Sequence, residues 1–324
     1  MPFHSVSPSR AFGGIGGGVV AAAVSAVLLT AATGCSAGRA NTAVPAAAPA
    51  GRAPVVLSSV DLKLPIERYL FSASEKQSLV KAVRILVQQC MDRYDVPYRP
   101  APIGPSLGVR SLMDRRYGIT DERAARADGY HLGDRDPRTH PGPPPARPTG
   151  TSLLVLTGRT GPAASSATTA PASPPPVVNG QRVPAGGCAA QAEAAIAGSG
   201  RLGPSDLAQD LNDRSFLTTK ADARVTGVFR AWSRCMKGKG FSYPDPLNAM
   251  SDRRFQGAQP THQEIQVASA DVDCKRQTNL VGMWFAVETA FEKAQIRQNA
   301  PELTAVLKAK QSQLRAAAAV LATD

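Results

Sequence analysis

The placement of the cysteines constrains the fold of this chain more than any other sequence feature. Cys35 follows an N-terminal apolar run, and four cysteines come after it, at positions 90, 188, 235 and 274. In an exported chain, an even number of cysteines predicts two disulfide bonds, and the sequence alone permits three pairings. No CxxC motif occurs, and the four cysteines are 98, 47 and 39 residues apart. We therefore expect neither a thioredoxin-like centre nor a zinc site.

The N-terminus predicts that the chain is exported. A short segment that contains Arg10 precedes an apolar run from Val19 to Leu29, and the small residues 32–34 stand directly before Cys35. This order resembles a lipobox, the site at which bacterial lipoproteins are cleaved and acylated. The resemblance implies that residues 1–34 are a lipoprotein signal peptide and that Cys35 carries a diacylglyceryl anchor. Two acyl chains suffice to hold a protein on the extracytoplasmic face of the cell membrane.

Two alternatives to this lipid anchor stay open, because Ala32 stands where the strict motif prefers leucine. Ordinary signal cleavage near Ala-x-Ala would release a secreted protein. An uncleaved helix over residues 15–33 would instead remain in the bilayer, although its glycines and alanines make it only weakly apolar. In each case, residues 35–59 are nearly all Ala, Pro, Gly and Val, a composition that predicts a disordered tether.

The net charge of the chain is strongly positive, at +12. Because the predicted export separates the chain from nucleic acid, and the basic residues are dispersed without interleaved aromatic residues, we expect no nucleic-acid partner. A solvated basic surface accounts for this charge without any partner. The alternative is attraction to anionic lipid head groups or to an anionic wall polymer.

An internal similarity predicts how the cysteines pair. Residues 90–98 and 235–243 both read Cys-Met, four residues, an apolar residue, one residue and Tyr, and prolines follow or interrupt each segment. Each segment ends a predicted amphipathic helix, and each is followed by a further cysteine within a helical stretch. We infer two related helix-turn-helix halves, which predicts the bonds Cys90–Cys188 and Cys235–Cys274. Chance, or shared local packing without duplication, would also produce such a match.

The remaining pattern predicts a mainly α-helical domain over residues 60–324. Capping boxes at Ser72–Glu75 and Thr261–Glu264 each open a helix, and the second helix is expected to continue through Phe291. Asn299–Pro301 interrupts it, and a C-terminal helix follows within residues 299–324.

One long insertion and a hairpin complete the predicted domain. Residues 135–176 are rich in Pro, Thr, Ser, Ala and Gly, which predicts disorder, with a short β-like run at Leu153–Leu156. The Asn-Gly pair at positions 179–180 predicts a small β-hairpin over residues 177–183.

Five segments resemble a group of uncharacterised exported proteins and lipoproteins of high-GC Gram-positive, actinobacterial, bacteria. They are residues 116–121 with 129–132, 178–188, 229–236 and 279–284. With the C-terminal helix, the resemblance covers most of residues 60–324. It implies an exported helical domain. No activity or catalytic residue is assigned to the group, so no functional residue transfers to this chain.

Little in the sequence points to catalysis. The histidines form no metal-ligand spacing, and no phosphate-binding loop is present outside the signal, so no metal or cofactor is expected. The carboxylates Glu264, Asp271 and Glu288 leave one enzyme hypothesis open, a hydrolase of cell-wall glycan or peptide. On a continuous helix, the first two lie ~10.5 Å apart and the last two ~25 Å apart, against ~5–9.5 Å for hydrolytic pairs.

The aromatic residues permit a binding hypothesis. Tyr98 and Tyr243 stand beside prolines at matching positions and are candidates for the two sides of a ligand groove. We therefore predict a membrane-anchored, non-catalytic envelope protein that binds a protein partner or a wall polymer. The hydrolase stays as one alternative, and a carrier of a small ligand is another.

Overall fold

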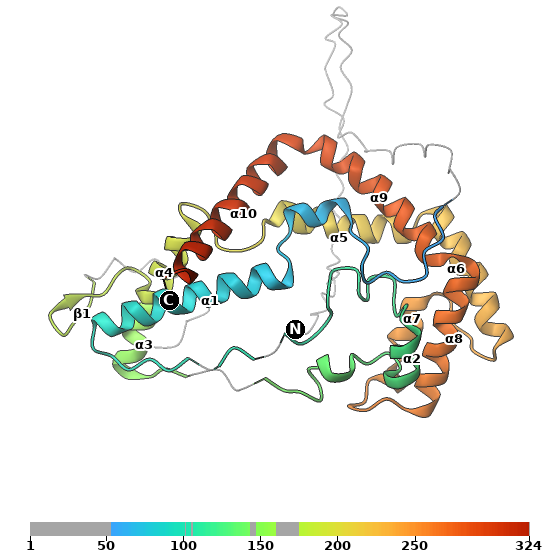
Figure 1. Ribbon diagram of the computed structural model, residues 1–324, viewed down its shortest axis with the longest axis horizontal. Helices are drawn as coiled ribbons and strands as arrows, with labels where there is room; N and C mark the ends of the chain where they lie inside the picture. Colours follow the sequence, from blue (N-terminus) through green and yellow to red (C-terminus); the bar gives the residue numbers. More distant parts are fainter. Residues whose placement is uncertain (1–52, 101, 105, 143–146, 160–174, 324) are drawn as a thin grey trace, which may run out of the picture. The chain divides into compact units, whose positions relative to one another are not determined.

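The computed structural model describes residues 53–100, 102–104, 106–142, 147–159 and 175–323 (Figure 1). The predicted signal peptide, Cys35 and the tether up to residue 52 lie outside the described residues. Within them the chain is mainly α-helical with one small antiparallel hairpin, as the sequence predicts. None of the helices in the described part is long and apolar enough to cross a bilayer.

The elements of the described residues follow one another as short 3-10 helices (η), α-helices and two strands. In chain order they are η1 (Pro65–Tyr69), α1 (Ala73–Arg93), α2 (Glu122–Asp128), η2 (Gly133–Arg135), α3 (Gly150–Thr157), β1 (Val177–Val178), β2 (Gln181–Arg182), α4 (Gly187–Ala197), α5 (Asp206–Lys220), α6 (Ala223–Gly238), α7 (Pro246–Met250), η3 (Arg253–Phe255), α8 (His262–Thr278), α9 (Leu280–Gln298) and α10 (Ala300–Leu321).

Both predicted capping boxes begin helices. The Ser72 hydroxyl accepts the N–H of Glu75 at 3.1 Å, and the Glu75 carboxylate accepts the N–H of Ser72 at 2.7 Å. Thr261 and Glu264 make the same reciprocal pair at the start of α8. Because the first N–H groups of a helix have no partner within it, these side chains define where α1 and α8 begin.

The structure contains both predicted disulfide bonds. Cys90, in the last turn of α1, is bonded to Cys188, the second residue of α4. Cys235, in the last turn of α6, is bonded to Cys274, near the C-terminal end of α8. In both bonds, the first cysteine lies in the last turn of a helix. The second cysteine lies at the start of α4 in one bond and near the end of α8 in the other.

The repeated Cys-Met segments form the same helix C-terminal motif. The N–H of Val96 donates to the Met91 carbonyl at 3.3 Å, and the N–H of Phe241 donates to the Met236 carbonyl at 2.9 Å. The residue before each donor has a left-handed φ, +53° in the first segment and +88° in the second. This is the Schellman arrangement, in which an apolar residue after the cap packs back on the helix. Local capping thus accounts for the matched spacing.

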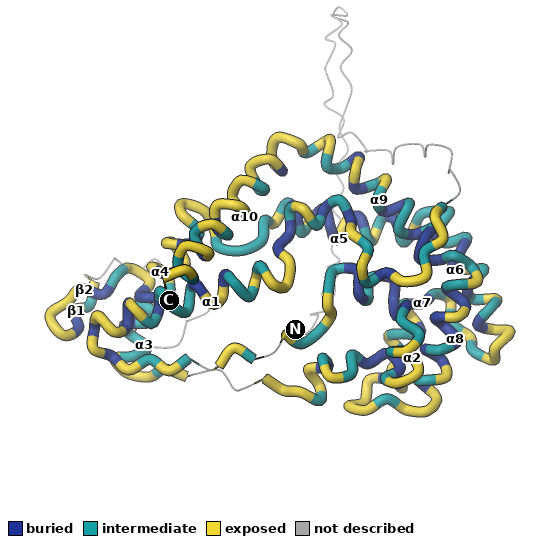
Figure 2. Tube along the Cα trace, in the orientation of Figure 1, coloured by how far each residue is buried: buried dark blue, intermediate teal, exposed yellow. Residues whose placement is uncertain are grey.

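The buried residues are dark blue in Figure 2. The hydrophobic ones among them form one large cluster and two smaller ones. Trp232 of α6 and Trp284 of α9 are fully buried in the large cluster, to which α5 and α8 also contribute. The second cluster surrounds the Cys90–Cys188 bond and includes Val155 and Val183. The third joins α1 to α4 and α10 through residues that include Phe71 and Ala317.

The long helix expected from Thr261 through Phe291 is divided in two. Asn279 adopts a left-handed φ of +50°, which ends α8, and α9 begins at the next residue. Its side chain accepts the N–H of Val56 at 3.2 Å and donates to the Pro54 carbonyl at 3.1 Å. Asn is one of the few residues that tolerate this conformation, so tertiary contacts with a distant segment set the break.

The predicted insertion at 135–176 is ordered in part. Residues 153–156, expected to be β-like, belong to the helix α3, which packs on α4. A run of four apolar residues fits a strand or a buried helix equally well, and here Val155 is buried against the Cys188 region. Residues 143–146 and 160–174 lie outside the described residues.

The packed chain also begins before the predicted boundary at residue 60. The Ser59 hydroxyl donates to the Met113 carbonyl at 2.8 Å, and the Ser59 side chain is fully buried. The Pro54 carbonyl lies so close to Gly282 that a Cβ at that position would meet it at 2.0 Å. Residues 53–59 therefore belong to the folded domain, although their composition resembles a tether.

Candidate ligand-binding cleft

An open cleft of about 1000 Å³ lies between η1, the start of α1, residues 109–112 and the helices α5, α9 and α10. Six basic side chains and three carboxylates line it: Lys63, Arg68, Lys76, Arg110, Lys293 and Lys310 against Glu67, Glu75 and Asp213. The lining charges therefore sum to +3, six minus three. Because the lining comes from several elements that are far apart in the sequence, no local sequence motif predicts this cleft.

Two of the cleft carboxylates already accept hydrogen bonds from backbone N–H groups at the start of a helix. Glu67 accepts the N–H of Leu64 at 2.8 Å and lies 3.4 Å from the Lys63 ammonium. Glu75 caps α1 and lies 3.0 Å from the Lys310 ammonium. Burial raises the pKa of Glu75, but the Ser72 N–H and Lys310 outweigh it and hold this pKa below its usual range. Both carboxylates are therefore already engaged by partners within the protein.

Three of the cleft cations have no carboxylate partner among the described residues. Arg68, Lys76 and Lys293 are exposed, and each stands on a different element: η1, α1 and α9 respectively. Close to Lys293, the buried hydroxyl oxygen of Thr289 has no hydrogen-bond partner in the described part of the chain. The cleft thus offers unused positive charge and an unused hydrogen-bonding group.

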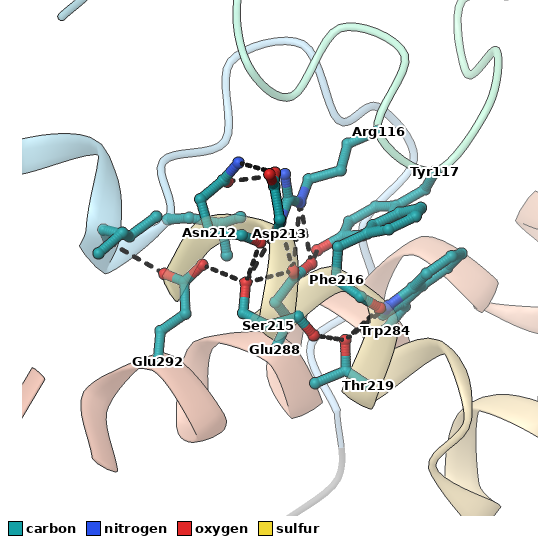
Figure 3. Close-up of polar contacts among 12 residues, drawn as sticks. Arg116, Tyr117, Asn212, Asp213, Ser215, Phe216, Thr219, Trp284, Glu288 and Glu292 are labelled. Carbon is teal, nitrogen blue, oxygen red and sulfur yellow. Dashed lines mark hydrogen bonds and ion pairs between the residues drawn. The ribbon is translucent and has the colours of Figure 1, made fainter. Parts of the chain in front are cut away.

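A buried polar network adjoins the cleft at Asn212, which belongs to both (Figure 3). Arg116 forms an ion pair with Glu288 of α9, with Nη2 at 2.6 Å from Oε1 and Nε at 3.1 Å from Oε2. Arg116 also donates to the Asn212 side chain and carbonyl, both at 3.0 Å. The Tyr117 hydroxyl donates to the second Glu288 oxygen at 2.6 Å. These contacts join residues 116–117 to α5 and α9.

Ser215 links the two carboxylates of this network. Its hydroxyl oxygen lies 2.9 Å from Glu288 Oε1 and 3.0 Å from Glu292 Oε1. The Asn212 carbonyl lies 2.8 Å from the same oxygen, so the single hydroxyl proton cannot serve all three acceptors, and a protonated carboxyl group would instead donate to Ser215. Arg116 forms its ion pair with Glu288 and not with Glu292, which makes Glu292 the carboxyl group favoured to hold a proton. Burial raises the pKa of Glu292 to about 7, and the neighbouring Glu288 adds to the rise.

We expect the proton on Glu292 to make stability depend on pH. The folded state holds this proton more tightly than the unfolded chain, whose ordinary value is 4.5, so the contribution is complete below pH 4.5 and is lost as pH rises through about 7. The loss amounts to about 3 kcal/mol. Urea unfolding at about pH 5 and about pH 8 measures it, and the Glu292→Gln variant should lose most of the difference.

The control for this experiment is Glu193→Gln, which removes an exposed carboxylate on α4. It should keep the pH dependence of the wild-type protein. A Glu292→Gln variant with an unchanged difference between the two pH values would contradict a proton on Glu292.

The three carboxylates considered for hydrolysis are fully buried, with 0% exposure for Glu264, Asp271 and Glu288. Glu288 belongs to the network beside the cleft. Glu264 and Asp271 are brought together by Tyr130, whose N–H donates to Glu264 at 2.9 Å and whose hydroxyl donates to Asp271 at 3.3 Å. A substrate cannot reach any of them without opening the core, so the geometry does not support the hydrolase.

Asp271 and Glu264 are also engaged by other buried groups. Asp271 lies 2.9 Å from the Lys275 ammonium and accepts the indole N–H of Trp232 at 2.9 Å. Burial raises the pKa of Asp271 despite these partners. Glu264 lies 3.4 Å from Nε2 of the buried His131, whose Nδ1 is 3.3 Å from Asp136. These groups hold α2, α6 and α8 together.

The structure does not bring Tyr98 and Tyr243 together as two sides of one groove. Tyr98 packs against the cluster around Cys90, and Tyr243 packs against the large cluster. The Tyr243 hydroxyl donates to Asp252 at 2.8 Å and accepts from Arg254 at 2.9 Å. Burial and Asp252 raise the pKa of Tyr243 to about 12. The two tyrosines therefore pack against different hydrophobic clusters.

The cleft residues Arg68, Lys76, Thr289 and Lys293 were missed by the sequence analysis. Arg68, Lys76 and Lys293 are ordinary for exposed helix positions and Thr289 is half-buried, and only the approach of η1, α1 and α9 makes them neighbours of one cleft. Within the described residues, no group of three or more His, Cys, Asp or Glu side chains is arranged to hold a metal ion. No protein-family model, curated protein or solved structure matches this chain.

Proposed function

We propose that this chain is a lipoprotein anchored through Cys35 outside the cytoplasm, and that its folded domain is a non-catalytic binding protein of the cell envelope. The cleft is the observation that supports binding, because concave sites with a few convergent polar groups are where proteins hold ligands. The burial of the candidate catalytic carboxylates supports a role without catalysis. The two disulfide bonds are typical of an oxidising compartment outside the cytoplasm.

Photocrosslinking in intact cells tests whether the cleft binds a ligand. A photoreactive residue at Gln209, which lines the cleft on α5, is expected to give a reproducible adduct. The same residue at Leu217, exposed on α5 and outside the cleft lining, is the matched control and should give none. Repeated failure to capture an adduct from position 209, or equal capture from both positions, would contradict the proposal.

Replacing Cys35 with alanine tests the anchor. In an actinobacterial host, the wild-type chain should fractionate with membranes and incorporate labelled palmitate, whereas Cys35→Ala should incorporate none. Loss of both acyl chains removes the contribution of ~0.8 kcal/mol per buried methylene that holds a lipoprotein in the bilayer. If the two proteins incorporate palmitate equally or not at all, the lipid anchor at Cys35 is wrong.

A further inference from the structure

We infer that the cleft binds an extended anionic chain that carries several phosphate groups, such as a segment of a phosphodiester wall polymer. This inference rests on the proposed function and names the class of ligand that the cleft would take. Three features of the described residues lead to it: the uncompensated charge of the lining, an unpartnered buried hydroxyl, and the size and shape of the cleft.

The charge of the cleft favours an anion. Of its carboxylates, Glu67 and Glu75 are already held by backbone N–H groups and by lysines. Arg68, Lys76 and Lys293 have no such partner among the described residues. An anionic group that enters the cleft can therefore bind these three cations, and no internal ion pair has to be broken first. A cationic ligand would find Asp213 as the one lining carboxylate without a basic partner in the described part of the chain.

Thr289 provides a second, independent indication of a ligand. Thr289 lines the cleft one helical turn before Lys293. Its hydroxyl oxygen is covered by neighbouring atoms and has no hydrogen-bond partner within the described residues. A buried hydroxyl without a partner is costly, which is why such groups in native proteins are usually satisfied by water or by a ligand. A rotation of the Thr289 side chain toward the cleft would let this O–H donate to a phosphate oxygen held by Lys293.

Size and shape distinguish an extended chain from other anions. A volume of about 1000 Å³ is at the upper end of ligand sites, ~300–1000 Å³, and far exceeds what a single phosphate fills. The three unpartnered cations stand on three separate elements, which suits charges that repeat along a chain. A flat bilayer surface cannot enter a concave site, so the geometry favours a polymer segment over lipid head groups.

The probe for this inference is oligo(glycerol phosphate), which carries a phosphodiester at each unit. The full-length protein in neutral detergent should bind it, and the binding should weaken as salt rises. The triple variant Arg68→Ala, Lys76→Ala, Lys293→Ala should bind about tenfold more weakly or worse. The triple variant Lys81→Ala, Arg230→Ala, Lys308→Ala removes the same charge from exposed positions outside the cleft lining and should stay within about twofold of the wild type.

A neutral variant separates the site from overall charge. Thr289→Val removes the hydroxyl, keeps the side-chain shape and leaves the net charge unchanged, so any loss of affinity reports a direct contact. We expect affinity to fall a few-fold while the thermal unfolding temperature does not decrease, because the hydroxyl has no partner in the described structure. Unchanged affinity in Thr289→Val together with equal affinity in the two triple variants would overturn the inference.

Further arms of the experiment identify the source of the phosphate. If phosphatidylglycerol vesicles bind through the cleft cations and the soluble oligomer does not bind, the ligand is a membrane surface, and the inference of a polymer is wrong. Inorganic phosphate that binds as tightly as the oligomer would overturn the need for an extended chain. If the oligomer fails while crosslinking from Gln209 succeeds, the cleft is still a binding site and only the ligand class is wrong.

Discussion

Replacing Cys90 and Cys188 together with serine is expected to lower the free energy of unfolding by about 4–5 kcal/mol. The bond closes a loop of 98 residues, and without it the unfolded chain regains the conformational freedom of that loop. Within the described part of the chain, the cluster around this bond has ten buried residues, five of which are valines. Equilibrium unfolding in urea measures the loss, and hydrogen exchange should show it first in α3, α4 and the hairpin.

The matched variant for this prediction removes Cys235 and Cys274, which close a loop of 39 residues. It should cost about 4 kcal/mol, slightly less than the longer loop. Because this bond lies at the large cluster, its loss should affect α6 and α8 and leave the exchange of α3 unchanged. A loss below about 1 kcal/mol for both pairs would contradict a structural role of the disulfides.

Replacing Arg116 with methionine is expected to cost about 3–5 kcal/mol, because it leaves the fully buried Glu288 carboxylate without its cation. The Asn212 carbonyl and the Ser215 hydroxyl would also lose a donor. The side chain of methionine fills similar space, so the loss reports mainly the uncompensated charge. Urea unfolding at neutral pH measures it.

The control for this prediction is Arg126→Met, which breaks an exposed ion pair with Glu122 on α2. Exposed pairs contribute about 0–1 kcal/mol, so this variant should be close to wild type. If Arg116→Met and Arg126→Met destabilise the protein equally, the network in Figure 3 does not hold α5 and α9 together as we describe.

Features that depend on neighbouring residues were predicted correctly from the sequence. The capping boxes at Ser72 and Thr261 begin helices, because a side chain three residues away satisfies the free N–H groups. The Asn179–Gly180 pair turns the hairpin for the same local reason, since both residues adopt a positive φ there. The pairing of the cysteines was also correct, although the match that suggested it is explained by a shared helix cap.

Features that depend on distant segments were predicted wrongly or not at all. The helix after Thr261 ends at Asn279 because residues 54–56 bind its side chain, and a periodic pattern of apolar residues does not reveal such a contact. Residues 153–156 form a helix because of what they pack against. The candidate carboxylates were chosen by type and spacing, and the structure buries them in its core. The candidate tyrosines are partly buried and pack against two separate clusters.

The local structure of this protein follows from its amino-acid sequence: its helical character, its helix starts and its hairpin. Hydrogen bonds between near neighbours and the periodicity of apolar residues set these features. Which charges are buried and which line the cleft depends instead on tertiary packing, because burial involves segments far apart in the chain. Arg116 and Arg68 are the same residue type, yet one is enclosed by α5 and α9 and the other faces the cleft.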